Sequence, residues 1–286
     1  MHLGFSTMNN LHRARPDELA RMLEERGYES LWIGEHSHIP TSRKTPYPAG
    51  GELPEQYKHM ADPFIAIAMA AAVTRKLHFG TSVTLILERE VFTLAKEVAT
   101  LDRLCGGRLT IGIGVGWNEE EFNNVAKMPW GKRYSGMKEC ALALRALWTQ
   151  EEAEYHGEWY AFDKVWSYPK PLQKPHPPIV LGVAGRTGMA HAAEWGDGWH
   201  PLDVGTKDFG IRLERFKQMV RDAGRDPAKV EVTVVNMGEP NVDRLRRYRE
   251  LGINRAVIGG AVAQDNLGEM TRFADRYAKL AAELAA

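Results

Sequence analysis

The chain has few cysteines and no excess of charge of one sign, and each lack excludes a class of protein. Only Cys105 and Cys140 occur among its 286 residues, without a CxxC motif, which argues against a disulfide framework and against a zinc site with thiolate ligands. Lysine plus arginine and aspartate plus glutamate both number 37, so no overall field favours nucleic acid or an anionic membrane. Any anionic ligand must therefore be recognised locally.

Long apolar runs are also missing. No run is long enough to span a bilayer, and the N-terminal sequence MHLGFSTMNN does not have the basic, apolar and cleavable segments of a secretory signal. We therefore expect a cytoplasmic protein that acts on a small molecule, with neither nucleic acid nor a membrane as partner.

Short apolar segments alternate with longer amphipathic ones along the whole chain. The segments predicted as strands are 2–6, 30–34, 77–84, 108–114, 179–182, 198–202, 230–236 and 255–259. Eight strands that alternate with helices favour a closed (β/α)8 barrel over an open doubly wound sheet, because open sheets usually have fewer strands. We predict a single α/β domain over residues 1–286, folded as a TIM barrel.

Two segments interrupt this alternation. Residues 35–60 form a loop after the second strand that is rich in proline, glycine, histidine and tyrosine, and loops of this length are often lids or binding loops. Residues 151–178 combine an aromatic stretch around His156-Gly157, which predicts a hairpin, with five prolines. We interpret 151–178 as an insertion between the fourth and fifth strands of the same barrel.

Glycine-rich loops follow the fourth and fifth strands, where a barrel carries its active site. Glycine lets the backbone approach a ligand closely, and a helix N-terminus with an arginine favours phosphate. The candidates after strand four are Gly114, Val115, Gly116 and Trp117. Those after strand five are Gly182, Val183, Ala184, Gly185 and Arg186. The second set predicts a phosphate site.

The second strand is followed by Glu35-His36-Ser37-His38. A histidine beside a carboxylate can transfer a proton near neutral pH, whereas His-x-His spacing is also found in barrel metal sites. No third ligand is evident at another strand end, because His191 is predicted within a helix and His200 within a strand. Proton transfer, a metal site and a loop histidine satisfied by its neighbours all stay open at this point.

Taken together, several segments resemble one superfamily. They are SLWIGEH at 30–36, GTSV at 80–83, AKEVATLDRLCGGRLTIGIGVGW at 95–117, PKPLQKPHPPIVLG at 169–182 and DGWHP at 197–201. In this order they are similar to the luciferase-like monooxygenases, the bacterial luciferase-type flavin and deazaflavin barrels. The chain length and the loop HIPTSRKTPYP resemble the branch that uses the deazaflavin coenzyme F-420 more than the FMN monooxygenases.

The resemblance implies a role for each candidate. The coenzyme ring would lie across the barrel mouth against a non-proline cis peptide at Ser82-Val83, with Gly114 to Trp117 at its border. Its phosphate would lie on Gly182 to Arg186. His36 would transfer a proton at the reactive edge, positioned by Glu35. The anionic tail of the coenzyme would bind to cationic side chains of the long loop, which are Arg43, Lys44 and Lys58.

The sequence also departs from the family. Glu88-Arg89-Glu90-Val91 stands where Arg-Asn-Pro is common, and Trp117 lies near the position of a glutamate in the glucose-6-phosphate dehydrogenases, which disfavours that substrate. We predict hydride transfer between F-420 and a small organic substrate. The alternatives are an FMN-dependent monooxygenase served by a flavin reductase, a metal-dependent hydrolase with His36 and His38, and a flavin-binding barrel without catalysis. A homodimer is expected from the superfamily.

Overall fold

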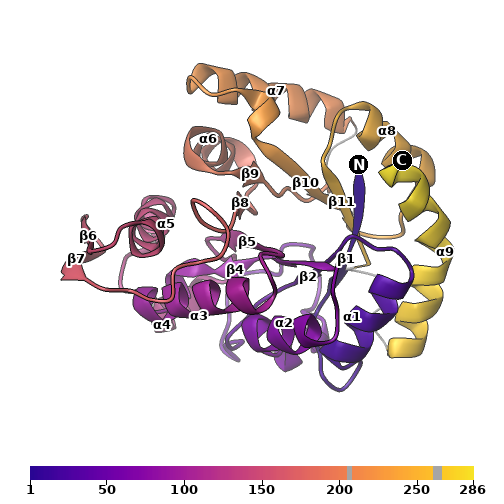
Figure 1. Cartoon of the computed structure of the whole chain (residues 1–286), viewed down its shortest axis with the longest axis horizontal. Helices are drawn as coiled ribbons and strands as arrows, with labels where there is room; N and C mark the ends of the chain where they lie inside the picture. The colour runs from indigo at the N-terminus through magenta and orange to yellow at the C-terminus, as the bar shows by residue number, and fades with distance from the viewer. Residues whose placement is uncertain (205–207, 260–265) are drawn as a thin grey trace.

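The computed structural model describes residues 1–204, 208–259 and 266–286 (Figure 1). Parallel strands pair side by side from β1 around to β11 and back to β1, and the pairing of β3 with β5 closes the ring. The strands are β1 (His2–Thr7), β2 (Ser30–Ile33), β3 (His78–Thr81) with its continuation β4 (Thr84–Leu85), β5 (Leu109–Gly114), β8 (Ile179–Leu181), β9 (Gly198–Trp199), β10 (Glu231–Val235) and β11 (Arg255–Ile258). The predicted eight-stranded TIM barrel is confirmed.

Helices cover the outside of the barrel (Figure 1). They are α1 (Pro16–Glu25), α2 (Pro63–Ala72), α3 (Val91–Leu104), α4 (Glu119–Val125), α5 (Arg133–Thr149), α6 (Gly185–Trp195), α7 (Phe209–Asp222), α8 (Val242–Glu250) and α9 (Leu267–Ala285). Carboxylate side chains cap the N-termini of two of these helices. The side chains of Asp62 and Glu90 accept hydrogen bonds from the first N–H groups of α2 and α3. None of the helices within the described ranges is long and apolar enough to cross a membrane.

The barrel interior is filled by aromatic side chains rather than left open. Trp32 on β2 is buried and stacks on His200, with ring centroids 4.6 Å apart. A Cβ atom at Gly80 would lie 2.3 Å from the Trp32 ring. The glycine of the third strand is therefore needed for packing, because any side chain there would occupy the space of the indole.

Two predicted strands differ from the structure by more than one residue at an end. Segment 77–84 breaks between β3 and β4 at the Ser82-Val83 bond, which is a cis peptide as the family resemblance implied. Segment 198–202 keeps only Gly198–Trp199 as a strand, followed by an isolated bridge at Leu202. Helix α7 begins at Phe209, and residues 205–207 lie outside the described part of the chain.

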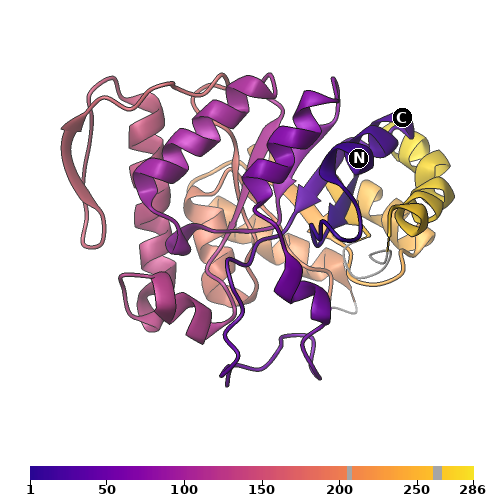
Figure 2. The same ribbon diagram turned by 90° about the horizontal axis from the view of Figure 1, so that it is seen from below.

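Both interruptions of the barrel pattern lie outside it. The insertion 151–178 carries a hairpin of β6 (Ala153–His156) and β7 (Ala161–Val165), which projects beside α5. The loop 35–60 contains a short 3-10 helix, η1 (Glu55–His59), and extends from one end of the barrel in Figure 2. Thr45 of this loop is hydrogen-bonded to Glu120 on α4, the helix that follows β5, so the loop lies at the carboxyl ends of the strands.

Candidate active site

The loop 35–60 is tied to the start of α4 by one carboxylate. Glu120 accepts hydrogen bonds from the backbone N–H of Thr45 at 3.1 Å and from its hydroxyl at 2.6 Å. These bonds, with another from the Lys44 N–H, lower the pKa of Glu120 to about 2. The carboxylate is therefore charged at neutral pH and holds the loop against the helix that follows β5.

His36, at the start of this loop, lies between a hydrogen-bond acceptor and a hydrogen-bond donor. Its Nδ1 is 2.6 Å from Oε2 of Glu121 on α4, and its Nε2 is 3.2 Å from the indole Nε1 of Trp117. Only 7% of the His36 side chain and 1% of the Glu121 side chain are exposed. The rings of Trp117 and Tyr57 pack against the imidazole at 5.6 and 5.4 Å. The structure thus brings together two predicted residues, His36 and Trp117, with one that the sequence did not indicate.

Glu35 is directed to a different partner. Its carboxylate accepts a hydrogen bond from Nε of Arg89 at 2.6 Å and another from the N–H of Leu85 at 3.0 Å. Arg89 also binds Asp62 at 2.6 Å and Glu97 at 3.2 Å. Burial raises the pKa of Glu35, and Arg89 opposes that shift. These contacts favour a positioning role for Glu35 over a direct role in proton transfer.

A third carboxyl group, that of Glu88, lies close enough to Glu121 and Glu35 to interact with their charges. Its Oε2 is buried without a hydrogen-bond partner among the described residues, and its Oε1 lies 3.5 Å from where a Cβ of Gly116 would be. Burial, with the negative charges of Glu121 and Glu35, raises the pKa of Glu88 to about 9. Glu88 is therefore a neutral acid at pH 7, beside a glycine predicted to border the coenzyme ring.

The cis peptide places Val83 between two of the predicted glycines. A Cβ at Gly114 would lie 2.5 Å from one methyl group of Val83, and a Cβ at Gly182 would lie 2.2 Å from the other. On the other side of the bond, the Ser82 hydroxyl donates to Nε2 of His200 at 2.9 Å, because Nδ1 of that ring donates to the Thr233 carbonyl. Burial lowers the pKa of His200 to about 4, so this histidine is neutral and structural.

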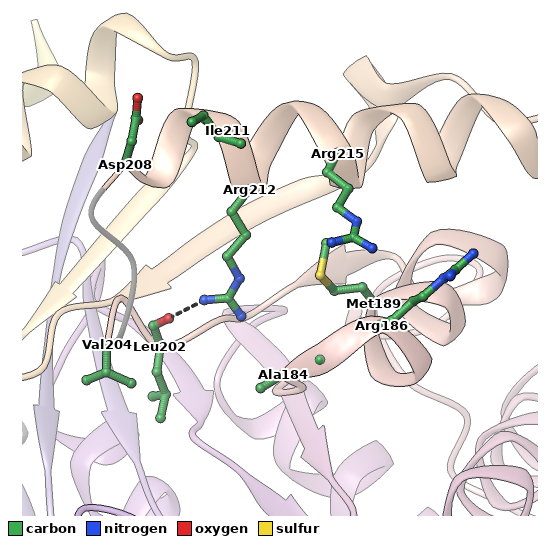
Figure 3. A pocket seen from close by; sticks show the side chains of 10 residues that line it. Ala184, Arg186, Met189, Leu202, Val204, Asp208, Ile211, Arg212 and Arg215 are labelled. Carbon is green, nitrogen blue, oxygen red and sulfur yellow. Dashed lines mark hydrogen bonds between the residues drawn. The ribbon is translucent and has the colours of Figure 1, made fainter.

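The predicted phosphate loop opens onto a pocket of about 610 Å³ between the starts of α6 and α7 (Figure 3). Ala184 stands at the N-cap of α6 without a side-chain hydrogen bond, so the first N–H groups of the helix have no side-chain cap. Arg212 and Arg215 project from α7 toward α6 in Figure 3, and Arg186 lines the same pocket. Helix N-terminus and guanidinium groups together suit a phosphate.

The three arginines differ in how far they are already engaged. Arg212 donates to the Leu202 carbonyl at 2.8 Å and lies over the Trp199 ring. For Arg186 and Arg215, the described residues supply neither a hydrogen bond nor a carboxylate partner. Sequence reasoning found Arg186 but missed the other two, although their spacing of three residues on the helix after the sixth strand is a signal that they share a face.

The cations expected for an anionic tail are placed differently. Arg43 lies over the Trp117 ring at 5.4 Å and donates to the Thr45 carbonyl. Lys58 is paired with Glu55 at 2.6 Å, and Lys44 is exposed. Arg43 and Lys58 already interact with other residues of the loop. The arginines of the α6/α7 pocket are therefore more available to bind an anionic ligand.

The His36-x-His38 pair does not form a shared site. His38 accepts a hydrogen bond from the Asn124 amide at 2.9 Å and contacts the Ser37 hydroxyl at 2.8 Å, whereas His36 contacts Glu121 and Trp117. Within residues 1–204, 208–259 and 266–286, no group of three or more His, Cys, Asp and Glu side chains is arranged to hold a metal ion.

The structure is a TIM barrel that carries a buried contact between His36 and Glu121 and, between α6 and α7, a pocket lined by arginines. Residues 4–244 match the model of the luciferase-like monooxygenase family, and the chain belongs to this family. An uncharacterised protein of Mycobacterium tuberculosis strain H37Rv is 37% identical over 267 residues, which cover 91% of this chain and 92% of the relative.

Known activities among similar proteins are of two kinds. The FMNH2-dependent dimethylsulfone monooxygenase of Pseudomonas putida is 37% identical over 123 residues, 42% of this chain and 33% of that protein. The monooxygenase RslO1 of Streptomyces bottropensis has a TM-score of 0.76 at 18% identity, over 100% of both chains. An F-420-dependent secondary alcohol dehydrogenase has a TM-score of 0.74 at 18% identity, over 97% of both. Membership of the family makes the chain a luciferase-like oxidoreductase or monooxygenase.

Proposed function

We propose that this protein transfers a hydride between coenzyme F-420 and a small organic substrate. The observation that supports the proposal is the pocket between α6 and α7. One phosphate needs the uncapped start of α6 and one guanidinium, whereas the pocket also presents Arg215, which has no carboxylate partner among the described residues, and Arg212. The additional positive charge suits a coenzyme with carboxylates beyond its phosphate, as F-420 has in its glutamate tail.

The residues present fit a phosphate-bearing flavin or deazaflavin. When bound, the coenzyme would accept or donate the hydride, which is chemistry that the side chains cannot supply. Gly185, at φ +70°, and Arg186 would hold the phosphate, while Val115, Gly116 and Trp117 would border the ring. His36 would take up or return one proton at Nε2, and the loop 35–60 would exclude water from this proton.

The test is a fluorescence titration of the purified protein with F-420 and, separately, with FMN. We expect tighter binding of F-420. Arg186→Ala and Arg215→Ala should each weaken F-420 binding by roughly 1.5–3 kcal/mol, or about tenfold to a hundredfold, for a lost charged hydrogen bond. Arg221→Ala, on the same helix and hydrogen-bonded to Gln218, is the matched control and should leave affinity unchanged. Unchanged affinity in both pocket variants would remove the phosphate assignment.

The second candidate is an FMN-dependent monooxygenase, favoured by the similarity to the dimethylsulfone monooxygenase. Such an enzyme would receive reduced FMN from a partner reductase and would consume oxygen. Preference for FMN in the titration, with oxygen uptake in the presence of reduced FMN, would establish this candidate in place of hydride transfer to F-420.

A further inference from the structure

His36 has an arrangement of hydrogen bonds that defines where its proton lies. The indole nitrogen of Trp117 can only donate, so Nε2 of His36, 3.2 Å away, must accept and carries no hydrogen. A neutral imidazole then has its hydrogen on Nδ1, which donates to Oε2 of Glu121 at 2.6 Å. The contacts are consistent with one tautomer and not with the imidazolium, whose Nε2–H would oppose the indole N–H.

Glu121 has few other interactions that would explain its burial. Its side chain is 1% exposed, and its second oxygen, Oε1, has no hydrogen-bond partner among the described residues. A buried carboxylate with one free oxygen is unfavourable unless its remaining bond is strong. The Nδ1–H of His36 supplies that bond, so burial of Glu121 and orientation of His36 depend on each other.

We propose that Glu121 is a positioning residue that fixes His36 as the Nδ1–H tautomer, and that Trp117 occupies the hydrogen bond at Nε2 which a substrate group takes over. The inference deepens the proposed function, because it concerns the histidine that would transfer the proton there. It also limits the substrate: only a hydrogen-bond donor, such as a hydroxyl group, can replace the indole at an unprotonated Nε2. A carbonyl oxygen cannot do so until this nitrogen carries a proton.

The tautomer can be measured on the whole protein without coenzyme. Protein labelled with ¹⁵N in histidine gives a set of long-range ¹H–¹⁵N correlations, from which His36 is assigned by its loss in His36→Gln. At pH 8 we expect a protonated Nδ1 and an unprotonated, hydrogen-bonded Nε2. A protonated Nε2 would overturn the proposal.

Three variants separate the two partners of the ring. Trp117→Phe should keep Nδ1–H, since Glu121 remains, and should shift the Nε2 resonance toward that of a nitrogen without a hydrogen bond. Adding Glu121→Leu should move the hydrogen largely to Nε2, which is the preferred site in a free imidazole. Adding Glu121→Gln instead should give a mixture of the two tautomers, because the amide can accept from Nδ1–H through its oxygen or donate to Nδ1 through its nitrogen.

Each of these outcomes bears on the proposal. Persistence of Nδ1–H in Trp117→Phe/Glu121→Leu would show that Glu121 does not fix the tautomer, and an unmoved Nε2 resonance in Trp117→Phe would remove the role of the indole. If the leucine variant fails to fold, the glutamine variant still tests the carboxylate, because an undiminished Nδ1–H population in Trp117→Phe/Glu121→Gln would show that the carboxylate does not fix the tautomer. An F-420 titration of the wild-type protein keeps this question apart from the coenzyme, since absence of F-420 binding with the expected tautomer would contradict only the proposed function.

Discussion

Two charged regions lie at the carboxyl ends of the strands, and they are built in opposite ways. Around His36, carboxylates are buried and each charge is committed: Glu35 to Arg89, and Glu121 to the imidazole. In the α6/α7 pocket, Arg186 and Arg215 are exposed and lack carboxylate partners among the described residues. The comparison indicates that the inner region, around His36, uses its charges to hold side chains in fixed positions. The outer region, the α6/α7 pocket, keeps its arginines available for a ligand. Changes in the two regions should therefore affect different measurements.

The largest expected effect is on turnover, from replacing His36. His36→Gln keeps an amide that can donate to Glu121 but cannot take up a proton, so we expect kcat to fall roughly 10²- to 10⁴-fold. The dissociation constant of the coenzyme should change no more than a few-fold, because His36 does not line the pocket. The measurement is steady-state kinetics with a titration of the same protein. Normal turnover with much weaker coenzyme binding would reverse the roles assigned to the two regions.

The next effect is on stability, from Arg89. Arg89→Met leaves Glu35 buried without its counter-ion and should lower the free energy of unfolding by roughly 3–5 kcal/mol, measured by urea denaturation. Arg246→Met is the matched control, since it breaks an ion pair with Glu283 that is about half exposed on both sides. The control should lose far less stability, because solvent screens the charges of an exposed ion pair. Equal losses would show that burial of the inner charges contributes nothing.

A smaller effect depends on pH and concerns Glu88. Its pKa rises from 4.5 to about 9 on folding, so between these values the unfolded chain releases a proton that the folded protein keeps. Stability should then fall as the pH rises through this window, by at most about 1.4 kcal/mol per pH unit. Glu88→Gln removes this dependence, and urea midpoints at pH 5.5 and 8.5 measure it. The urea midpoint of the variant, relative to that of the wild type, should be higher at pH 8.5 than at pH 5.5. If the two midpoints differ by the same amount at both pH values, the raised pKa of Glu88 is contradicted.

The smallest expected effect is the stability of the pocket variants. Arg186→Ala with Arg215→Ala should change the free energy of unfolding by no more than about 0.5 kcal/mol, because surface side chains without partners contribute little to the folded state. The same double variant should lose coenzyme affinity more than either single variant. A large loss of stability would place these arginines among the structural charges and weaken the contrast between the regions.

Sequence patterns predicted the barrel, the segment after the second strand that carries His36, and the glycine loop that carries Arg186. These features follow from local periodicity and from glycine at strand ends. The cis peptide at Ser82-Val83 came from family resemblance, and the structure confirms it. The partners of the predicted residues could not be read in the same way. Arg89 reaches Glu35 across 54 positions and Glu121 reaches His36 across 85, and the sequence contains no periodic signal for contacts at that separation.

Of the arginines in the α6/α7 pocket, sequence patterns predicted Arg186 but not Arg212 or Arg215. Arg186 follows a recognisable glycine loop, whereas Arg215 belongs to a part of the chain that fitted the superfamily only by its alternation of strands and helices. Its approach to α6 depends on the angle at which two neighbouring helices pack, and only the three-dimensional structure supplies that angle.

The contact between Val83 and the glycines at 114 and 182 affects how such sequences should be searched. These glycines leave room for a valine side chain, so a barrel that had lost its coenzyme would still require them in order to fold. A genome survey based on the glycine signature would therefore collect active and inactive descendants together. Requiring His36, Glu121, Arg186 and Arg215 as well would select the sequences that keep the proposed catalytic and coenzyme-binding residues, rather than all those that share the barrel fold.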